Sequence, residues 1–209
     1  MTDVKINQFP EFFKIADVEL RTDKPFENKW VPVSSFINGH GETLSLPERI
    51  TKDNVTRTYA IVYDGYIQKE GSSEDKNGME HTFHIYMTGG LSGKASARSI
   101  GVYMDIHKAL LAGREVEIYM HYLPKVKMEF KNASGKTIIR DVRIASKELE
   151  DEDLMAYKEV AGEYPRLNMQ EAREQWPESV MLLEAHLKGG KEVRDKSYIN
   201  EILNKEFAQ

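Results

Sequence analysis

The hydrophobic periodicity of this chain changes near residue 145, and this change constrains the fold more than any other feature. Before residue 145, apolar residues mostly alternate with polar ones, as they do in half-buried strands. After it, they recur at helical spacing, and Ser146 precedes an acidic turn that suits a helix N-terminus. Strands and helices that are separated along the chain are typical of the α+β class. We therefore predict an antiparallel β-rich body, residues 1–145, followed by a helical C-terminal subdomain, residues 146–209.

The body contains several strand-like segments and one clear helix. The strand-like segments are 17–21, 30–34, 55–68, 81–87, 114–123 and the two arms of a hairpin, 125–130 and 137–145. An apolar stripe from Ile100 to Leu111 predicts the helix, over about 98–112. Residues 69–80 are polar and predict a connecting loop. One helix between strands is the element order of an OB-like barrel, and an antiparallel sheet covered by one helix has the same order.

The composition excludes several classes of site. Cysteine is absent, which excludes disulfides, thiolate metal sites and thiol catalysis. No spacing typical of a metal site occurs, so we predict no metal and no cofactor. No apolar run approaches the roughly 18 residues of a membrane-spanning helix, and the N-terminus lacks a signal-peptide pattern. We therefore expect a cytoplasmic protein with no membrane partner.

The net charge of −5 conceals an uneven distribution. Residues 88–145 hold 10 basic and 5 acidic residues, a net charge of +5, whereas residues 146–209 hold 9 basic and 15 acidic residues, a net charge of −6. A locally basic stretch favours an anionic partner such as nucleic acid, and the acidic helical region is a candidate surface for a protein partner or a homo-oligomer. Ordinary scatter of charge over a solvated surface gives the same numbers.

A glycine- and serine-rich segment, residues 88–99, could bind an anion. It carries Lys94 and Arg98 at the start of the predicted helix, where backbone N–H groups attract negative charge. Thr88 and Ala95 stand where a phosphate-binding loop needs a glycine and a hydroxyl, so this segment does not predict nucleotide hydrolysis. A plain connection with helix-capping serines is the simpler alternative.

Two other groups of residues could contact nucleic acid. If two of the predicted strands are neighbours, His84, Tyr86, Tyr119 and His121 form one patch that could stack unpaired bases. The hairpin carries basic residues on both arms and in its turn: Lys125, Lys127, Lys131, Lys136 and Arg140. These cations would neutralise phosphates without reading sequence. Half-buried aromatic packing and a merely soluble hairpin explain the same residues.

These features favour a non-catalytic accessory protein that binds single-stranded DNA or RNA through the basic loop and the hairpin. We find no catalytic motif, and we expect the chain not to be an enzyme. One alternative is a protein–protein interaction, assembly or inhibitor protein that does not bind nucleic acid. Another is a small enzyme that acts on a nucleotide or phosphate ligand.

Overall fold

The computed structural model describes residues 4–38, 41, 43–44, 55–74, 79–91, 95–168, 176–189 and 196–208. In chain order, its elements are a short 3₁₀ helix η1 (Ile6–Gln8), β1 (Phe13–Leu20), β2 (Asn28–Asn38), β3 (Thr43–Leu44), β4 (Thr56–Tyr63), β5 (Tyr66–Ser72), α1 (Glu80–Thr88), α2 (Ala97–Leu111), β6 (Val116–Leu123), β7 (Val126–Lys131), β8 (Thr137–Val142), α3 (Ser146–Ala161), α4 (Glu178–Lys188) and α5 (Lys196–Phe207). Among the residues described, no helix is long and apolar enough to cross a membrane.

Six strands form one open sheet in the order β3-β2-β1-β6-β4-β5, and every neighbouring pair is antiparallel. The edge strands β3 and β5 are separated by the other four, so the sheet does not close on itself. The α+β class with an antiparallel sheet is therefore confirmed, and the OB-like barrel is wrong. β7 and β8 form a separate two-stranded hairpin, as the sequence predicts.

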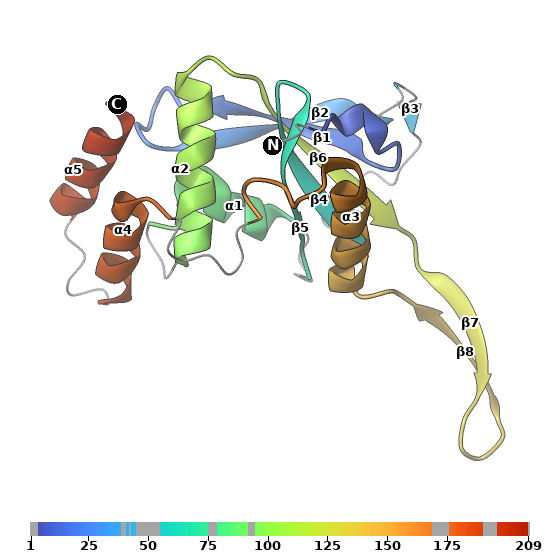
Figure 1. The fold of residues 1–209 in the computed structure, drawn as a ribbon. Coiled ribbons are helices and arrows are strands. Elements are labelled where there is room, and N and C mark those ends of the chain that lie inside the picture. The colour runs from blue at the N-terminus through green and yellow to red at the C-terminus, as the bar shows by residue number, and fades with distance from the viewer. Residues whose placement is uncertain are drawn as a thin grey trace.

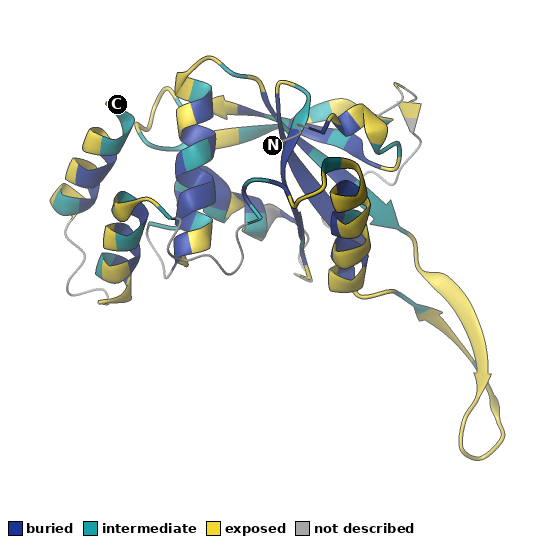
Figure 2. Cartoon of the chain, viewed as in Figure 1, coloured by how far each residue is buried: buried dark blue, intermediate teal, exposed yellow. Residues whose placement is uncertain are grey.

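Helical layers on both faces of the sheet explain why it stays open (Figure 1). On one face, Phe83 of α1 and Ile106 of α2 pack against Ile61 of β4. On the other face, Tyr157 of α3 packs with Ala60 of β4 and with the N-terminal segment. A sheet that is covered on both sides buries its apolar residues without closing. All eight residues of β4 are consequently buried (Figure 2), although their alternation predicts burial of only one face.

The C-terminal region is helical, as predicted, within the part of it that the structure describes. α3 packs on β4 and β5, and α4 packs on α2. Leu183 of α4 and Ile202 of α5 share a core cluster with Tyr103 of α2. The division of the chain into two domains at residue 145 stays a prediction.

Three segments of the body differ from their predicted structure. The predicted strand over 55–68 is two strands, β4 and β5, joined by a tight turn. The predicted strand at residues 81–87 is helix α1, because Met79, Phe83 and Tyr86 follow a helical spacing and are buried in one cluster. A short apolar run fits the periodicity of a strand as well as that of a helix, and the surface against which it packs decides which one forms. The predicted loop over 69–80 is wrong at its start, because β5 continues through Ser72. The predicted helix over 98–112 is confirmed as α2.

Candidate active site

A pair of buried tyrosines joins the sheet to α1. The hydroxyl oxygens of Tyr59 on β4 and Tyr86 on α1 lie 2.8 Å apart, and the two residues are only 2% and 4% exposed. Burial raises the pKa of both phenols, so both are neutral at physiological pH. One hydroxyl therefore donates a hydrogen bond to the other, and the pair holds a donor and an acceptor at a defined place.

The position of Tyr59 depends on a glycine in the neighbouring strand. Gly71 on β5 pairs with Tyr59, and a Cβ on Gly71 would lie 2.5 Å from the Tyr59 hydroxyl oxygen and 2.6 Å from Cζ. Both distances are shorter than any ordinary non-bonded contact. The tyrosine ring lies over this position because residue 71 has no side chain.

Replacing Gly71 by alanine is expected to displace the Tyr59 ring and to break its hydrogen bond with Tyr86. The ring cannot move freely, because its centroid lies 5.3 Å from that of Phe83 in an edge-on contact. Overpacking of this kind costs about 1–3 kcal/mol of the free energy of unfolding, which urea denaturation measures. An alanine variant as stable as the wild type would contradict this close approach.

A buried lysine lies on the same face of the sheet as Tyr59. Lys69 on β5 is 2% exposed, and its Nζ donates a hydrogen bond to the carbonyl oxygen of Glu70 at 3.1 Å. Burial, followed by the positive charge of Arg98, lowers the pKa of the Lys69 amine to about 8. An amine with a pKa this close to neutrality exchanges protons at physiological pH, which is what a general base must do.

The start of α3 brings a carboxylate to the edge strand β5. Glu150 is buried, and its Oε2 accepts a hydrogen bond from the Ser72 hydroxyl at 2.5 Å. The Nζ of Lys147 lies 3.4 Å from the same oxygen. The helix is held on the sheet where it begins, since the Ser146 hydroxyl accepts a hydrogen bond from the backbone N–H of Arg57 at 3.1 Å.

Glu150 and Arg98 influence all three buried groups. Burial is the largest cause of each pKa shift, and in addition the charge of Glu150 raises the pKa values of Tyr59, Tyr86 and Lys69, while that of Arg98 lowers them. Arg98 is exposed in the first turn of α2, where the helix dipole also attracts anions. We call these five residues, contributed by five different elements, the tyrosine–lysine cluster.

The opposite face of β5 carries a second buried acid. Glu70 is completely buried, and burial, followed by the negative charge of Asp153, raises its pKa to about 8. Its carboxyl is therefore protonated at neutral pH. Asp153 of α3 accepts a hydrogen bond from the Thr58 hydroxyl at 2.5 Å, and its carboxylate lies 2.9 Å from Nδ1 of His121. The contacts of Asp153 fasten α3 to the side of the sheet that faces away from Tyr59. Ser72 lies on this side too, so Glu150 acts on Tyr59, Tyr86 and Lys69 by charge from the other face of the edge strand β5.

The predicted aromatic and histidine patch is not present. His84 and Tyr86 lie on a helix instead of a strand, and two positions on a helix are roughly 200° apart around its axis. Tyr86 consequently faces the sheet, whereas His84 is exposed. Tyr119 and His121 lie on β6 toward the α3 side, so the sheet separates them from Tyr86.

The other predicted residues belong to the segment before α2 and to the hairpin. Lys94 is outside the described residues, and Arg98 lies in the first turn of α2. The hairpin residues are all exposed: Lys125, Lys127, Lys131, Lys136 and Arg140. The hairpin that carries them extends away from the sheet and helices (Figures 1 and 2). Their role in binding stays a prediction.

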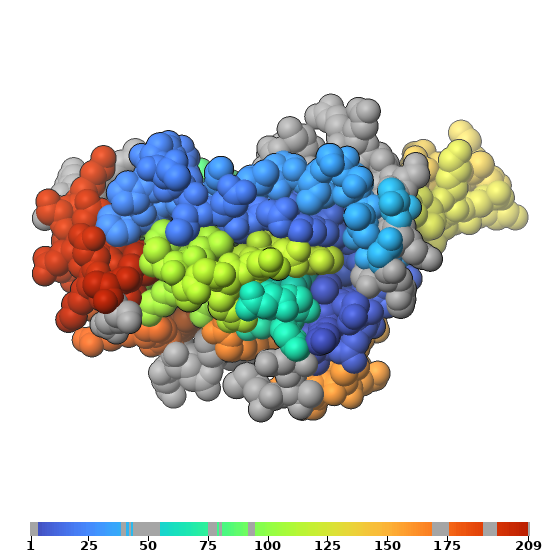
Figure 3. All heavy atoms as spheres, turned by 90° about the horizontal axis from the view of Figure 1, so that it is seen from above, coloured from blue at the N-terminus to red at the C-terminus, as the bar shows by residue number. Residues whose placement is uncertain are grey.

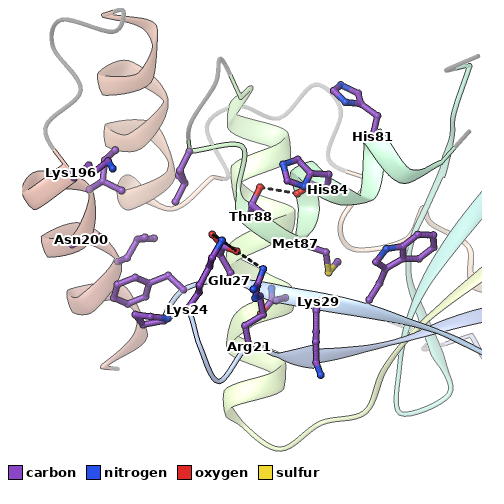
Figure 4. Close-up of a pocket in the computed structure, with 17 residues that line it drawn as sticks. Arg21, Lys24, Glu27, Lys29, His81, His84, Met87, Thr88, Lys196 and Asn200 are labelled. Carbon is purple, nitrogen blue, oxygen red and sulfur yellow. Dashed lines mark hydrogen bonds and ion pairs between the residues drawn. The ribbon is translucent and has the colours of Figure 1, made fainter. Parts of the chain in front are cut away.

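His84 faces a separate cleft, shown in Figure 4. This cleft has a volume of about 980 Å³ and lies between the β1–β2 turn, α1 and α5. Arg21 lines it and is already paired with Asp23 and Glu27, at 2.5 and 3.2 Å. Because Tyr86 lies on the sheet side of α1, the cleft and the tyrosine–lysine cluster are different sites.

Sequence reasoning missed Lys69 and Glu150 as site residues. Lys69 falls in the segment predicted as a loop. In the sequence, Glu150 is one of several acidic residues of a predicted solvated helix, and nothing distinguishes it from the others. A usable signal was present in the tight turn at Asp64-Gly65, which is typical of a hairpin. Pairing outward from that turn places Lys69 opposite Ile61 in the structure, in the middle of a buried strand.

Comparison with known proteins finds similar structures but no matching sequence. No protein-family model matches the chain, and no curated protein matches it. A mutant of bacteriophage T4 EndoII is similar, with 21% identity over 79% of this chain and 99% of that chain and a TM-score of 0.45. Restriction endonuclease HPY188I in complex with product DNA is also similar, with 16% identity over 80% of this chain and 87% of that chain and a TM-score of 0.41.

Both of these structures are of nucleases. On this finding, the prediction of a non-catalytic nucleic-acid-binding protein is wrong, and so is the prediction that the chain is not an enzyme. The physical reason for the error lies in the placement of the ionisable residues. Lys69, Tyr86 and Glu150 are far apart in the sequence and match no catalytic motif, so only the tertiary structure brings them together.

Proposed function

We propose that this protein is a phosphodiesterase that cleaves DNA. The observation that carries this proposal is the tyrosine–lysine cluster, in which an amine with a pKa of about 8 and two neutral phenols are buried and all feel the charges of Glu150 and Arg98. Ionisable groups with shifted pKa values, gathered from several elements, are typical of catalytic sites. DNA is the proposed substrate because residues 124–145, which lead directly into α3, hold six basic and two acidic residues, a net charge of +4.

Each group in the cluster has a role that suits its chemistry. The exposed guanidinium of Arg98 can bind two phosphate oxygens through parallel N–H donors. Lys69, in its neutral form, accepts a proton from the attacking water. The hydroxyl of Tyr59 orients that water through a hydrogen bond. Glu150 acts on Tyr59 and Lys69 by its charge, from the other face of the edge strand β5.

The proposed step is hydrolysis of one phosphodiester bond. The water oxygen forms a bond to phosphorus, and the bond between phosphorus and the leaving sugar oxygen breaks. One water proton moves to Lys69, and the leaving oxygen takes a proton from solvent. Lys69 then returns its proton to solvent, which restores the site. Arg98 stabilises the negative charge that develops on the phosphate oxygens.

A cleavage assay tests this proposal. Purified protein is incubated with supercoiled plasmid and with linear duplex, with Mg²⁺ and with EDTA, because Mg²⁺ commonly binds one or two carboxylates together with substrate phosphates. We expect nicked and linear products, separated on a gel. A wild-type protein that leaves every DNA intact under these conditions would disprove the proposed function.

Replacing Tyr59 by phenylalanine is expected to lower the cleavage rate roughly 10²-fold, because one oriented hydroxyl is lost and the ring remains. Tyr63→Phe is the matched control on the same strand. Tyr63 is also fully buried, and its hydroxyl donates to Asp105 at 3.0 Å, outside the cluster. This control should cleave DNA at close to the wild-type rate. Equal losses in the two variants would show that the effect is structural.

A further inference from the structure

The β7–β8 hairpin exposes an apolar surface that the described part of the chain does not cover. Val126, Met128 and Phe130 share one face and are 56%, 48% and 44% exposed, and Ile139, on the other face, is 59% exposed. The hairpin projects beyond the rest of the molecule in both views (Figures 1 and 3). A two-stranded hairpin is at best marginally stable alone in water, and exposed apolar patches usually mark a binding surface.

The charge of the hairpin identifies its partner as a polyanion. Residues 124–145 carry a net charge of +4 in a chain whose net charge is −5. The basic side chains occur on both strands and in the turn, so they can reach phosphates on either side of the hairpin. DNA carries negative charge along its whole length, whereas the surface of a second copy of this chain carries charges of both signs. DNA is therefore the better electrostatic complement to the hairpin.

From these properties we infer that the β7–β8 hairpin enters the major groove of double-stranded DNA. Its two strands pair along their whole length of six residues, which spans about 20 Å. Two strands about 5 Å apart, with their side chains, fit the major groove of about 12 Å and not the minor groove of about 6 Å. This inference deepens the proposed function, on which it rests, by naming duplex DNA as the substrate.

The two faces of the hairpin differ in what they can contact. Directly opposed residues share a face, so Met128 and Arg140 lie on the same side, next to Phe130. This face, turned toward the bases, offers apolar contacts to thymine methyl groups and a guanidinium to guanine. Lysines on the other face and in the turn then reach the phosphates that border the groove.

The root of the hairpin is fixed beside the tyrosine–lysine cluster. Nη2 of Arg143 lies 2.7 Å from the Glu74 carboxylate, and the same carboxylate accepts a hydrogen bond from the backbone N–H of Ser146. Glu74 follows two residues after Ser72, whose hydroxyl holds Glu150. DNA bound along the hairpin is therefore held at a set distance from the proposed catalytic groups.

The salt dependence of DNA binding tests this inference. The full chain binds a labelled 20-base-pair duplex at about pH 6, where Lys69 is protonated and cleavage is slow, and fluorescence anisotropy reports the affinity. Replacing Lys131 and Lys136 together by alanine should reduce the slope of log affinity against log salt by about 2. The control Lys205→Ala, on α5 at the other end of the molecule, should leave the slope unchanged.

A second variant separates base contacts from phosphate contacts. Arg140→Ala should reduce the preference for the best-bound duplex sequence over a scrambled one about 10-fold, whereas the double lysine variant should weaken both duplexes equally. Duplex binding with an unchanged slope in the lysine variants would overturn the inference. So would sedimentation showing that Phe130→Lys dissociates a dimer while DNA affinity stays the same. Cleavage by the wild type is a separate readout, so failure of the proposed function is distinguishable from failure of this inference.

Discussion

Glu150→Gln is expected to lower the rate of DNA cleavage roughly 10³-fold while leaving the protein folded. Glutamine keeps the shape of the side chain and can still accept the hydrogen bond from Ser72. It removes the one negative charge that acts on Tyr59, Tyr86 and Lys69 together. Cleavage of a labelled duplex under single-turnover conditions measures the loss.

The matched control for this variant is Glu148→Gln. Glu148 lies in the first turn of the same helix, is exposed and carries the same charge. Its replacement should change the cleavage rate less than 2-fold, and melting curves should show both variants folded. If the two substitutions reduce the rate equally, Glu150 acts only through the charge of α3 and is not a site residue.

Lys69→Met is expected to reduce cleavage by a similar factor, roughly 10³-fold, and to abolish its dependence on pH near 8. The amine is a base only when it has lost its proton, and burial lowers its pKa to about 8. The wild-type rate should therefore rise about tenfold per pH unit below 8 and level off above it. Rates measured from pH 6 to pH 10 at constant ionic strength give this profile.

Two controls assign this profile to the lysine. Glu70 also titrates near pH 8 but lies on the other face of the sheet, so Glu70→Gln should keep the rise in rate with pH. Lys158→Met, an exposed lysine of α3, should keep both the rate and the profile. A wild-type rate that falls as the pH rises through 8 would mean that Lys69 acts as a cation, which contradicts its role as a base.

The amine also affects stability, and stability changes with pH in the same direction as the rate. The pKa of Lys69 is lowered in the folded state, so the folded protein releases its proton at a lower pH than the unfolded chain does. The free energy of unfolding therefore gains from this residue as the pH rises from about 8 toward 10.5. Below about pH 8 the buried amine therefore costs stability, which is consistent with a lysine that is buried for its chemistry.

Much of the fold can be predicted from the spacing of apolar residues and turn residues that are close together in the sequence. The stripe from Ile100 to Leu111 predicts α2 because a helix with one apolar face can be recognised without knowing its partner. The hairpin of β7 and β8 is predicted for the same reason, since a turn between two alternating segments needs no third element. The start of α3 after Ala145 is likewise set by local chemistry.

Residues 81–87 show where local pattern fails. Their apolar residues fit a strand as well as a helix, and the sheet surface beneath them selects the helix by burying Phe83 and Tyr86 together. The open sheet could not be predicted either, because it depends on α1 and α2 covering one face while α3 and the N-terminal segment cover the other. Such contacts join residues that are distant in sequence.

The amino-acid sequence alone determined the α+β class, the central helix and the basic hairpin, because each depends on neighbours within a few turns or along one strand pair. The tertiary structure decided everything about the candidate active site. Lys69 has a shifted pKa only because β5 is covered, and Tyr59 meets Tyr86 only because Gly71 leaves room for its ring. Burial and proximity are properties of the packed molecule, and no local pattern carries them.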